Sequence, residues 1–171
     1  MKVVSNAGPL IALGKLSRLG LLPQLYGVVL IPPQVYQEVV VNGLQLGAPD
    51  ADAVQFLIQR KQIQVAPIIL SSNDSLLMSG IDLGEIEAIA LARRENADWV
   101  LIDNAHARRA ARSVNVRCKG TIGILLQALR EERLTLADFE LLIYEIKRQP
   151  ALWISERLCD EALTVARRES A

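Results

Sequence analysis

The stretch LGEIEAIALARRENADWVLIDN, residues 83–104, contains the two kinds of element that decide the fold. Residues 83–94 have the alanine-rich composition of a strong helix former. After a polar break, residues 99–102 form an apolar run that ends on Asp103 and Asn104, as a buried strand does. A helix followed by a buried strand is the repeating unit of a parallel α/β sheet.

The same alternation extends along the chain on both sides of this stretch. Strands are expected at residues 2–5, 28–31, 63–65, 99–102 and 116–118. Helices are expected at residues 9–19, 35–41, 49–60, 83–94, 106–114, 122–130, 136–147 and 155–168. Four or five short strands separated by helices predict a parallel sheet covered on both faces, in one α/β domain with a helical tail.

Composition is that of a globular protein and argues against several classes. The 171 residues carry 19 Lys and Arg against 19 Asp and Glu, so no global charge marks a nucleic-acid binder. Apolar runs are shorter than the roughly 18–20 residues of a membrane span, and no signal peptide is visible. Two distant cysteines, Cys118 and Cys159, fit reduced thiols in a cytoplasm better than a disulfide framework or a zinc site. A nucleophilic triad is disfavoured because His106 is the only histidine.

Several oxygen-bearing side chains fall where parallel strands end. Asn6 follows the first expected strand, Glu38 lies in the helix after the second, Glu85 opens a helix, and Asp103 ends the fourth strand. Sites in parallel sheets lie beyond the carboxyl ends of the strands, so these residues are expected to converge. Oxygen ligands suit Mg²⁺ or Mn²⁺, which would relieve the repulsion between carboxylates.

Each of these residues also has a purely structural interpretation. Asp103 could cap the next helix, and the helix dipole favours a carboxylate at Glu85 wherever the site lies. Glu38 could be an ordinary exposed helix residue, and Asn6 could hold a turn through its side chain. Glu87 is expected to face solvent or to form a local ion pair. The residues alone leave these alternatives open.

A basic segment follows Asp103 directly. Between residues 106 and 119 the chain has five positive side chains and no Asp or Glu: Arg108, Arg109, Arg112, Arg117 and Lys119. Arginine matches phosphate oxygens with two parallel hydrogen bonds, so this segment could contact phosphates beside the acidic site. The alternative is a solvated helix face paired with acids such as Glu95 or Asp98. The chain has only seven aromatic residues, which argues against extensive base stacking.

Five segments in this order resemble PIN-domain proteins. They are VSNAGPLIAL at 4–13, PPQVYQEV at 32–39, LGEIEAIALA at 83–92, VLIDN at 100–104 with RRAA at 108–111, and GTIGILL at 120–126. The last segment resembles the branch of prokaryotic PIN-like proteins of toxin–antitoxin type. The resemblance implies a three-layer α/β/α sandwich with a central, mainly parallel sheet of four to five strands. It covers residues 1–135, and residues 136–171 are expected to form a helical extension that packs on the same domain.

The resemblance also implies a function. PIN-like proteins are metal-dependent nucleases that usually cleave RNA, and many are toxins neutralised by a small antitoxin protein. Residue by residue, the ligands of Mg²⁺ or Mn²⁺ fall on Asn6, Glu38, Glu85 and Asp103, with Glu38, Glu85 and Asp103 as catalytic residues. Thr121 could orient a water through its hydroxyl group. The basic segment beside Asp103 predicts phosphate contacts by Arg108, Arg109 and Arg112.

The sequence departs from the family pattern at the ligands themselves. Asn6 stands where relatives usually have Asp, Asn104 where many have another acid, and Gly120-Thr121 where some have a further Asp. The first change leaves three carboxylates instead of four. An alternative function is therefore a PIN-like module that binds RNA or a protein partner without cleavage. A phosphoryl-transfer enzyme fits poorly, because such enzymes commonly need an Asp nucleophile at the position of Asn6.

The C-terminal segment from residue 134 onward is amphipathic. Leu136, Phe139, Leu142, Ile143 and Ile146 form one apolar stripe along an expected helix. Packing onto the chain's own domain is the simplest interpretation of this stripe. A groove for a partner helix, or the face of a homodimer, is the alternative.

Overall fold

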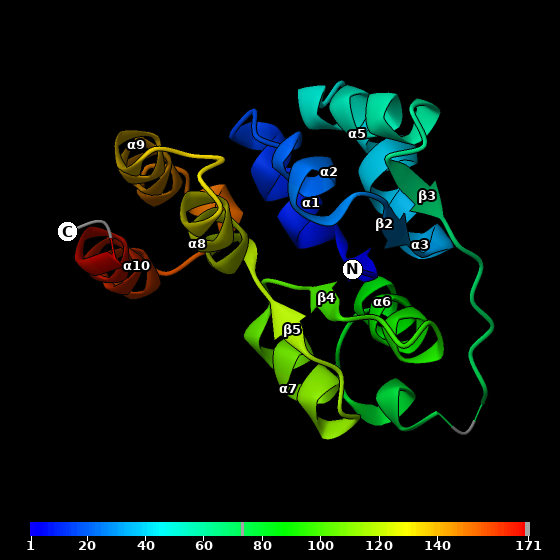
Figure 1. Cartoon of the computed structure of the whole chain (residues 1–171). Coiled ribbons are helices and arrows are strands. Elements are labelled where there is room, and N and C mark those ends of the chain that lie inside the picture. Colours follow the sequence, from blue (N-terminus) through cyan, green and yellow to red (C-terminus); the bar gives the residue numbers. More distant parts are fainter. Residues whose placement is uncertain (73, 170–171) are drawn as a thin grey trace. The chain divides into compact units, whose positions relative to one another are not determined.

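The computed structural model describes residues 1–72 and 74–169 and contains an α/β fold with a five-stranded, all-parallel sheet (Figure 1). The strands are β1 (Val3–Ser5), β2 (Val29–Ile31), β3 (Ile63–Val65), β4 (Trp99–Leu101) and β5 (Cys118–Lys119). Their order across the sheet is β3-β2-β1-β4-β5, and every neighbouring pair is parallel. The fold class expected from the sequence is confirmed.

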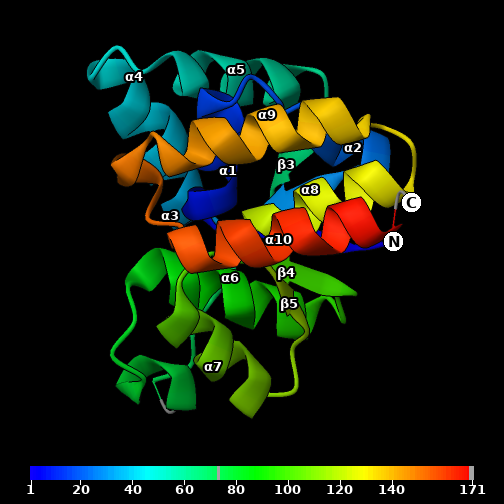
Figure 2. The same ribbon diagram turned by 90° about the vertical axis from the view of Figure 1, so that its left-hand side faces the viewer.

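The chain divides into two compact units, of which the first, Met1–Gly120, contains the whole sheet. Its helices are α1 (Ala7–Lys15), α2 (Leu21–Tyr26), α3 (Pro33–Tyr36), the π-helix η1 (Gln37–Asn42), α4 (Gly43–Gln45), α5 (Pro49–Gln59), the 3₁₀-helix η2 (Ser75–Met78), α6 (Leu83–Arg94) and α7 (Ala105–Ser113). Helices α1 and α5 pack together on one side of the sheet, and α6 and α7 pack together on the other (Figures 1 and 2). The sheet therefore lies between two layers of helices.

Residue types explain why this first unit is tightly packed. Below the sheet, a continuous core joins Val4 of β1, Ile89 of α6 and Val100 of β4, all of them fully buried. On the other face, a Cβ at Gly14 of α1 would lie only 2.4 Å from the Cβ of Asp50 in α5. Glycine at position 14 thus permits the close approach of α1 and α5.

The helix around residues 35–41 is longer and more irregular than the sequence indicates. It begins at Pro33, whose fixed φ suits a first helical position, and continues to Gln45 through a π-helical segment. Helix α2 was not expected, and α1 ends earlier than predicted because Ser17 has a positive φ of 53°. Short π-helical insertions are frequent at functional sites, and this one carries Glu38.

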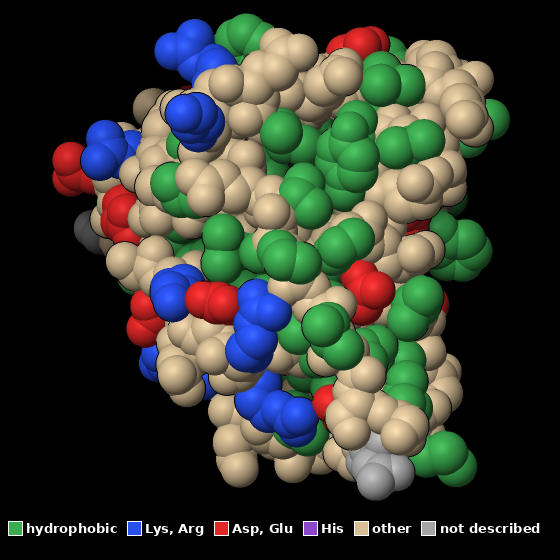
Figure 3. Space-filling view, turned by 90° about the vertical axis from the view of Figure 1, so that its right-hand side faces the viewer, with side chains coloured by type: hydrophobic (Ala, Val, Ile, Leu, Met, Phe, Trp, Pro, Cys, Tyr) green, Lys and Arg blue, Asp and Glu red, His purple; other side chains and the backbone are tan. Residues whose placement is uncertain are grey.

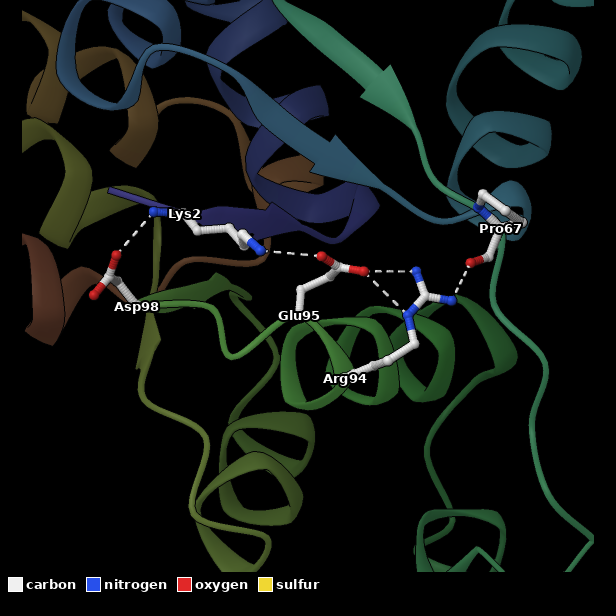
Figure 4. A network of polar contacts seen from close by, with 5 residues as sticks. All are labelled: Lys2, Pro67, Arg94, Glu95 and Asp98. Carbon is white, nitrogen blue, oxygen red and sulfur yellow. Dashed lines mark hydrogen bonds and ion pairs between the residues drawn. The ribbon is translucent and has the colours of Figure 1, made fainter.

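A polar network joins the amino ends of β1 and β4 to α6 (Figure 4). The Lys2 backbone N–H donates to Asp98 at 2.8 Å, and the Lys2 Nζ donates to Glu95 at 3.1 Å. The Arg94 guanidinium donates to the same Glu95 carboxylate at 2.9 Å and also to the Pro67 carbonyl oxygen. Hydrogen bonds from Lys2 and Arg94 hold the pKa of Glu95 below its ordinary value.

The second unit begins at Thr121 and consists of helices. They are α8 (Thr121–Arg130), α9 (Leu136–Lys147), the 3₁₀-helix η3 (Pro150–Leu152) and α10 (Glu156–Glu169). Helix α9 contacts both α8 and α10, and its expected apolar stripe is buried at Phe139, Leu142, Ile143 and Ile146. The boundary between residues 135 and 136 and the packing of the extension on the first unit remain predictions. Ser170 and Ala171 lie outside the described residues.

Among the described residues, no helix is both long and apolar enough to cross a lipid bilayer.

Candidate functional site

The sheet brings two distant segments together at the carboxyl ends of β1 and β4. Ser5 is in register with Leu101, and the Asn6 N–H extends the ladder by donating to the Leu101 carbonyl oxygen at 3.0 Å. The strand order reverses between these two neighbours, which is where open parallel sheets place their ligands. Asn6 and Asp103 both lie just beyond these strand ends.

Three oxygens from separate elements surround Gly84, in the first turn of α6. A Cβ at that position would lie 3.4 Å from Asp82 Oδ1, 3.4 Å from Glu38 Oε2 and 3.6 Å from Asn6 Oδ1. Because glycine has no Cβ, this space is available to a ligand of the oxygens. The sequence predicted Asn6 and Glu38 as site residues but missed Asp82.

The Asn6 side chain is buried without the hydrogen bond to the backbone that the turn interpretation predicts. Asn6 is 6% exposed and precedes α1 as its N-cap residue, yet its side chain makes no capping hydrogen bond. Its Oδ1 is buried and has no hydrogen-bond partner. A buried acceptor without a partner costs free energy, commonly about 1–3 kcal/mol. A bound cation would remove that cost.

Asp82 and Glu85 form a capping box at the start of α6. Asp82 Oδ1 accepts the Glu85 N–H at 2.8 Å, and a Glu85 carboxylate oxygen accepts the Asp82 N–H at 3.3 Å. The signal was present in the sequence, because an Asp followed three positions later by Glu is a variant of the capping-box pattern. The capping box places a second carboxylate beside the Asn6 and Glu38 oxygens.

Glu85 is 2% exposed and held from two sides. Besides the Asp82 N–H, the Asn104 side chain hydrogen-bonds to its carboxylate. Burial raises the pKa of Glu85, and the nearby Asp82 charge raises it further, while these two hydrogen bonds oppose the shift. Glu85 therefore acts as a structural cap in this arrangement, and its predicted role as a metal ligand remains a prediction.

Glu38 lies on the π-helix η1, with its side chain directed toward Gly84. Partial burial of its carboxylate raises the pKa of Glu38, and repulsion from Asp82 adds to this effect. The helix that carries it is anchored by Glu87 of α6, whose carboxylate accepts the Gln34 N–H at 2.9 Å. Glu87 therefore contacts the first turn of α3 and does not simply face solvent, as the sequence led us to expect.

Asp103 lies between two glycines. A Cβ at Gly8 would be 3.5 Å from Asp103 Oδ2, and a Cβ at Gly120 would be 2.8 Å from Asp103 Oδ1. The N-cap of α7 is Asn104, whose side chain accepts the His106 N–H at 2.8 Å, so capping of that helix does not depend on Asp103. The Asp103 carboxylate thus occupies a space that larger residues at these positions would fill.

The basic residues predicted to contact phosphates lie on α7, which begins beside Asp103. The Arg108 guanidinium donates to the Asp103 carbonyl oxygen at 2.9 Å. Arg109 pairs with His106 Nδ1 at 2.8 Å, and Arg112 is exposed. Thr121, the predicted water-orienting residue, begins α8 in the second unit, and its role remains a prediction.

The donors around Gly84 are of the kind that hard divalent cations prefer. All three are oxygens, two are carboxylates, and the third is the unpartnered amide oxygen of Asn6. Within the described ranges, however, no group of three Asp, Glu, His or Cys side chains is arranged to hold a metal. The candidate metal site therefore consists of the Asn6 amide oxygen and the carboxylates of Glu38 and Asp82.

Comparison with known proteins adds one finding. A family model described as a PIN domain matches residues 2–168, which is nearly the whole chain. No curated protein matches the sequence, and no solved structure matches it either.

Proposed function

The chain belongs to the PIN-domain family, and from this premise we propose that it is a metal-dependent endoribonuclease that hydrolyses RNA phosphodiester bonds. PIN domains are generally nucleases. The observation that carries the proposal is the buried, unpartnered Oδ1 of Asn6, which faces the same space as the Glu38 and Asp82 carboxylates. Mg²⁺ or Mn²⁺ is the cofactor that this set of donors would hold.

The roles of the residues follow from their positions. Asn6, Glu38 and Asp82 would hold the cation, and Asp103 would complete the site from the end of β4. Bound there, a divalent cation would polarise a phosphoryl oxygen and lower the pKa of a water. Glu85 fixes the start of α6 and with it the orientation of Asp82.

Substrate phosphates would be met by the arginines of α7. Arg108 is held next to Asp103 by its hydrogen bond to the backbone, so its charge lies beside the acidic site. Arg109 and Arg112 lie along the same helix and are exposed. Positive charge in this place would offset the repulsion between a polyanion and the carboxylates.

The decisive experiment measures RNA cleavage with and without Mn²⁺. The purified chain should cleave single-stranded RNA only when Mn²⁺ or Mg²⁺ is added, and Asp103→Asn should lower the rate at least a hundredfold. Asp52→Asn is the matched control, because Asp52 is an exposed acid in the first turn of α5, away from the site residues. Cleavage in a chelator, or full activity of Asp103→Asn, would refute the proposal.

A second candidate function is a PIN module that binds RNA or a protein partner without cleaving. It is favoured by Asn6 in place of Asp and by the absence, among the described residues, of a cluster of three acidic metal ligands. Asn6→Asp separates the two candidates because it adds a charge at the site. If wild type binds Mn²⁺ weakly and cleaves no RNA while Asn6→Asp gains Mn²⁺ affinity, the non-catalytic function is supported.

We propose in addition that the protein is a toxin neutralised by a small antitoxin protein, and that it forms a homodimer. Induced expression in a bacterial host should slow growth, and Asp103→Asn should relieve the effect at equal protein levels. Growth inhibition that persists in Asp103→Asn would argue against a toxin that acts by cleavage.

A further inference from the structure

A shallow cavity lies near the amino ends of β4 and β5, away from Asn6 and Asp103 at the carboxyl ends. It has a volume of about 400 Å³ and is lined by Trp99, Arg112, Asn115, Val116, Arg117 and Cys118. None of these lining residues is acidic. Asp98 Oδ1 lies 3.5 Å from Arg117 Nη2 in an exposed ion pair. The cavity therefore has a net positive lining.

The Trp99 indole orders the cations at this cavity. Arg117 Cζ lies 4.9 Å from the centroid of the ring, and Lys119 Nζ lies 4.4 Å from it. Cations over an indole are attracted by the electron-rich face of the ring. The ring thus brings two positive side chains together at one end of the cavity.

Helix α7 connects this cavity to the acidic site. It runs from the carboxyl end of β4 back to the amino end of β5 and lies alongside β5 (Figure 1). Arg108 contacts the Asp103 backbone at its start, Arg112 follows one turn later, and Arg117 precedes β5. Residues four positions apart share one face of a helix, so Arg108 and Arg112 lie on the same face of α7. Arg117 follows the helix and lines the cavity together with Arg112. We call Arg108, Arg112 and Arg117 the arginine track.

The charge pattern differs on the face of the molecule seen in Figure 3. There, Lys and Arg side chains are interspersed with Asp and Glu, and hydrophobic side chains lie between them. A mixed surface of this kind attracts a polyanion less than a run of one sign does. The arginine track is the better candidate for contact with a nucleic acid.

We propose that the arginine track and the Trp99 cavity form a second contact site for the RNA strand, beyond the nucleotides at the acidic site. This inference rests on the proposed function, because it assigns a path to that substrate. Guanidinium groups bind phosphate oxygens, and guanidinium planes and aromatic rings stack against unpaired bases. Positions 99 and 103 are four residues apart along an extended chain, or roughly 13 Å. A single strand of several nucleotides bound at the acidic site extends well beyond this distance, whereas a dinucleotide centred on that site extends about half as far to either side.

The test compares the binding of two RNA lengths in a chelator, so that no cleavage occurs. Arg117→Gln should weaken binding of a single-stranded RNA of about ten nucleotides at least threefold and leave dinucleotide binding unchanged. The dependence of log K on log salt concentration should become shallower by about 0.7, the value for one lost phosphate contact on a single strand. Arg60→Gln is the matched control, because Arg60 is also an exposed arginine over an aromatic ring, 5.4 Å from the centroid of Phe56.

Fluorescence gives an independent readout of the cavity. The chain contains two tryptophans, Trp99 and Trp153, so Trp153→Phe leaves Trp99 as the only indole. Adding the longer RNA to this variant should change its emission, and adding the dinucleotide should not.

The outcomes separate this inference from the proposed nuclease function. If Arg117→Gln and Arg60→Gln bind the longer RNA as wild type does, or if Trp99 emission does not respond, the second contact site is refuted while the nuclease proposal stands. If the longer RNA binds through Arg117 but is never cleaved with Mn²⁺, the second contact site stands and hydrolysis fails. If the wild-type chain binds no RNA of either length, the second contact site is refuted.

Discussion

Gly84 decides how much room the oxygens of Asn6, Glu38 and Asp82 enclose. In Gly84→Ala, the new methyl group would lie 3.4–3.6 Å from all three oxygens, which is ordinary contact and not a clash. Alanine is favoured over glycine in a helix by about 1 kcal/mol, so thermal stability should not fall. The affinity for Mn²⁺ should nevertheless drop at least tenfold, because the methyl group occupies the space that the oxygens face.

Calorimetric titration with Mn²⁺, paired with a melting curve, checks this prediction. Gly20→Ala is the control, because Gly20 is exposed and a Cβ there would approach only the flexible end of Gln24. Unchanged Mn²⁺ affinity in Gly84→Ala would show that the cation binds elsewhere.

Single residues also show where the sequence could and could not predict the site. The sequence predicted Asn6, Glu38 and Asp103 from their places after or beyond the expected strands and from the resemblance to PIN-domain proteins. The structure places Asn6 and Glu38 oxygens beside Gly84, and the Asp103 carboxylate beside Gly8 and Gly120. Asp82 was not predicted, because Glu85 matches the acidic residue of the first turn of α6 and the N-cap residue before it was not considered. Only the three-dimensional approach of Glu38 to Gly84 reveals that Asp82 also faces this space.

At the scale of elements, the hydrogen bond between Glu87 and the Gln34 N–H links α6 to the start of α3. The N-cap residue of α3 is Pro32, whose side chain offers no acceptor, so the carboxylate of Glu87 takes over that role for the Gln34 N–H. Glu87→Ala should lower the free energy of unfolding by about 1–2 kcal/mol, as the loss of a helix cap does. Glu87→Gln keeps an acceptor oxygen and should lose less.

Urea unfolding measures both variants. If Glu87→Ala is as stable as wild type, the hydrogen bond to Gln34 contributes nothing to the fold. A parallel loss of Mn²⁺ affinity in Glu87→Ala, restored in Glu87→Gln, would show that this bond also positions Glu38.

The network at the amino ends of β1 and β4 predicts a dependence on pH. The pKa of Glu95 is lowered by its hydrogen bonds with Lys2 and Arg94. A carboxyl group with a lowered pKa stabilises the fold above its ordinary pKa, 4.5, and this stabilisation is lost as the pH falls through the folded-state value. Melting temperatures of wild type and Glu95→Gln should therefore differ modestly at pH 7 and converge well below pH 4.5.

High salt should reduce the same difference, because the charges in this network are exposed and screened. A gap between wild type and Glu95→Gln that stays constant from pH 7 to pH 3 would mean that the charge of Glu95 does not stabilise the fold.

The sequence predicts a helix accurately where its apolar period and its N-cap are both visible in neighbouring residues. The bounds of α6 and α9 match the expected ranges, since both have a strong periodic pattern and a defined N-cap. Helix α2 was missed because Pro23 stands inside a six-residue helix, and the π-helix η1 has no sequence signal that separates it from an α-helix.

At the scale of the whole molecule, cation binding should stabilise the fold by mass action. At an Mn²⁺ concentration of about one hundred times its Kd, the gain is about 2.7 kcal/mol. For a chain of this length that corresponds to roughly 5–10 °C in melting temperature. Differential scanning fluorimetry with and without Mn²⁺ measures the shift, and a tenfold loss of affinity in Gly84→Ala should remove about half of it.

The absence of any Mn²⁺-dependent shift in wild type would argue for the non-catalytic PIN module. Global properties could not have decided this question from the sequence. With 19 positive and 19 negative side chains, the net charge is zero, and only the local distribution on α7 carries information about a polyanionic partner.

The parallel pairing of β1 with β4 has a consequence for biosynthesis. During translation β1 emerges first. Its neighbour β4, and Asp103 after β4, appear only after about one hundred residues have been made. A nascent or prematurely terminated chain shorter than this lacks both β4 and Asp103. The carboxyl edge of the sheet is therefore completed only after most of the polypeptide has left the exit tunnel.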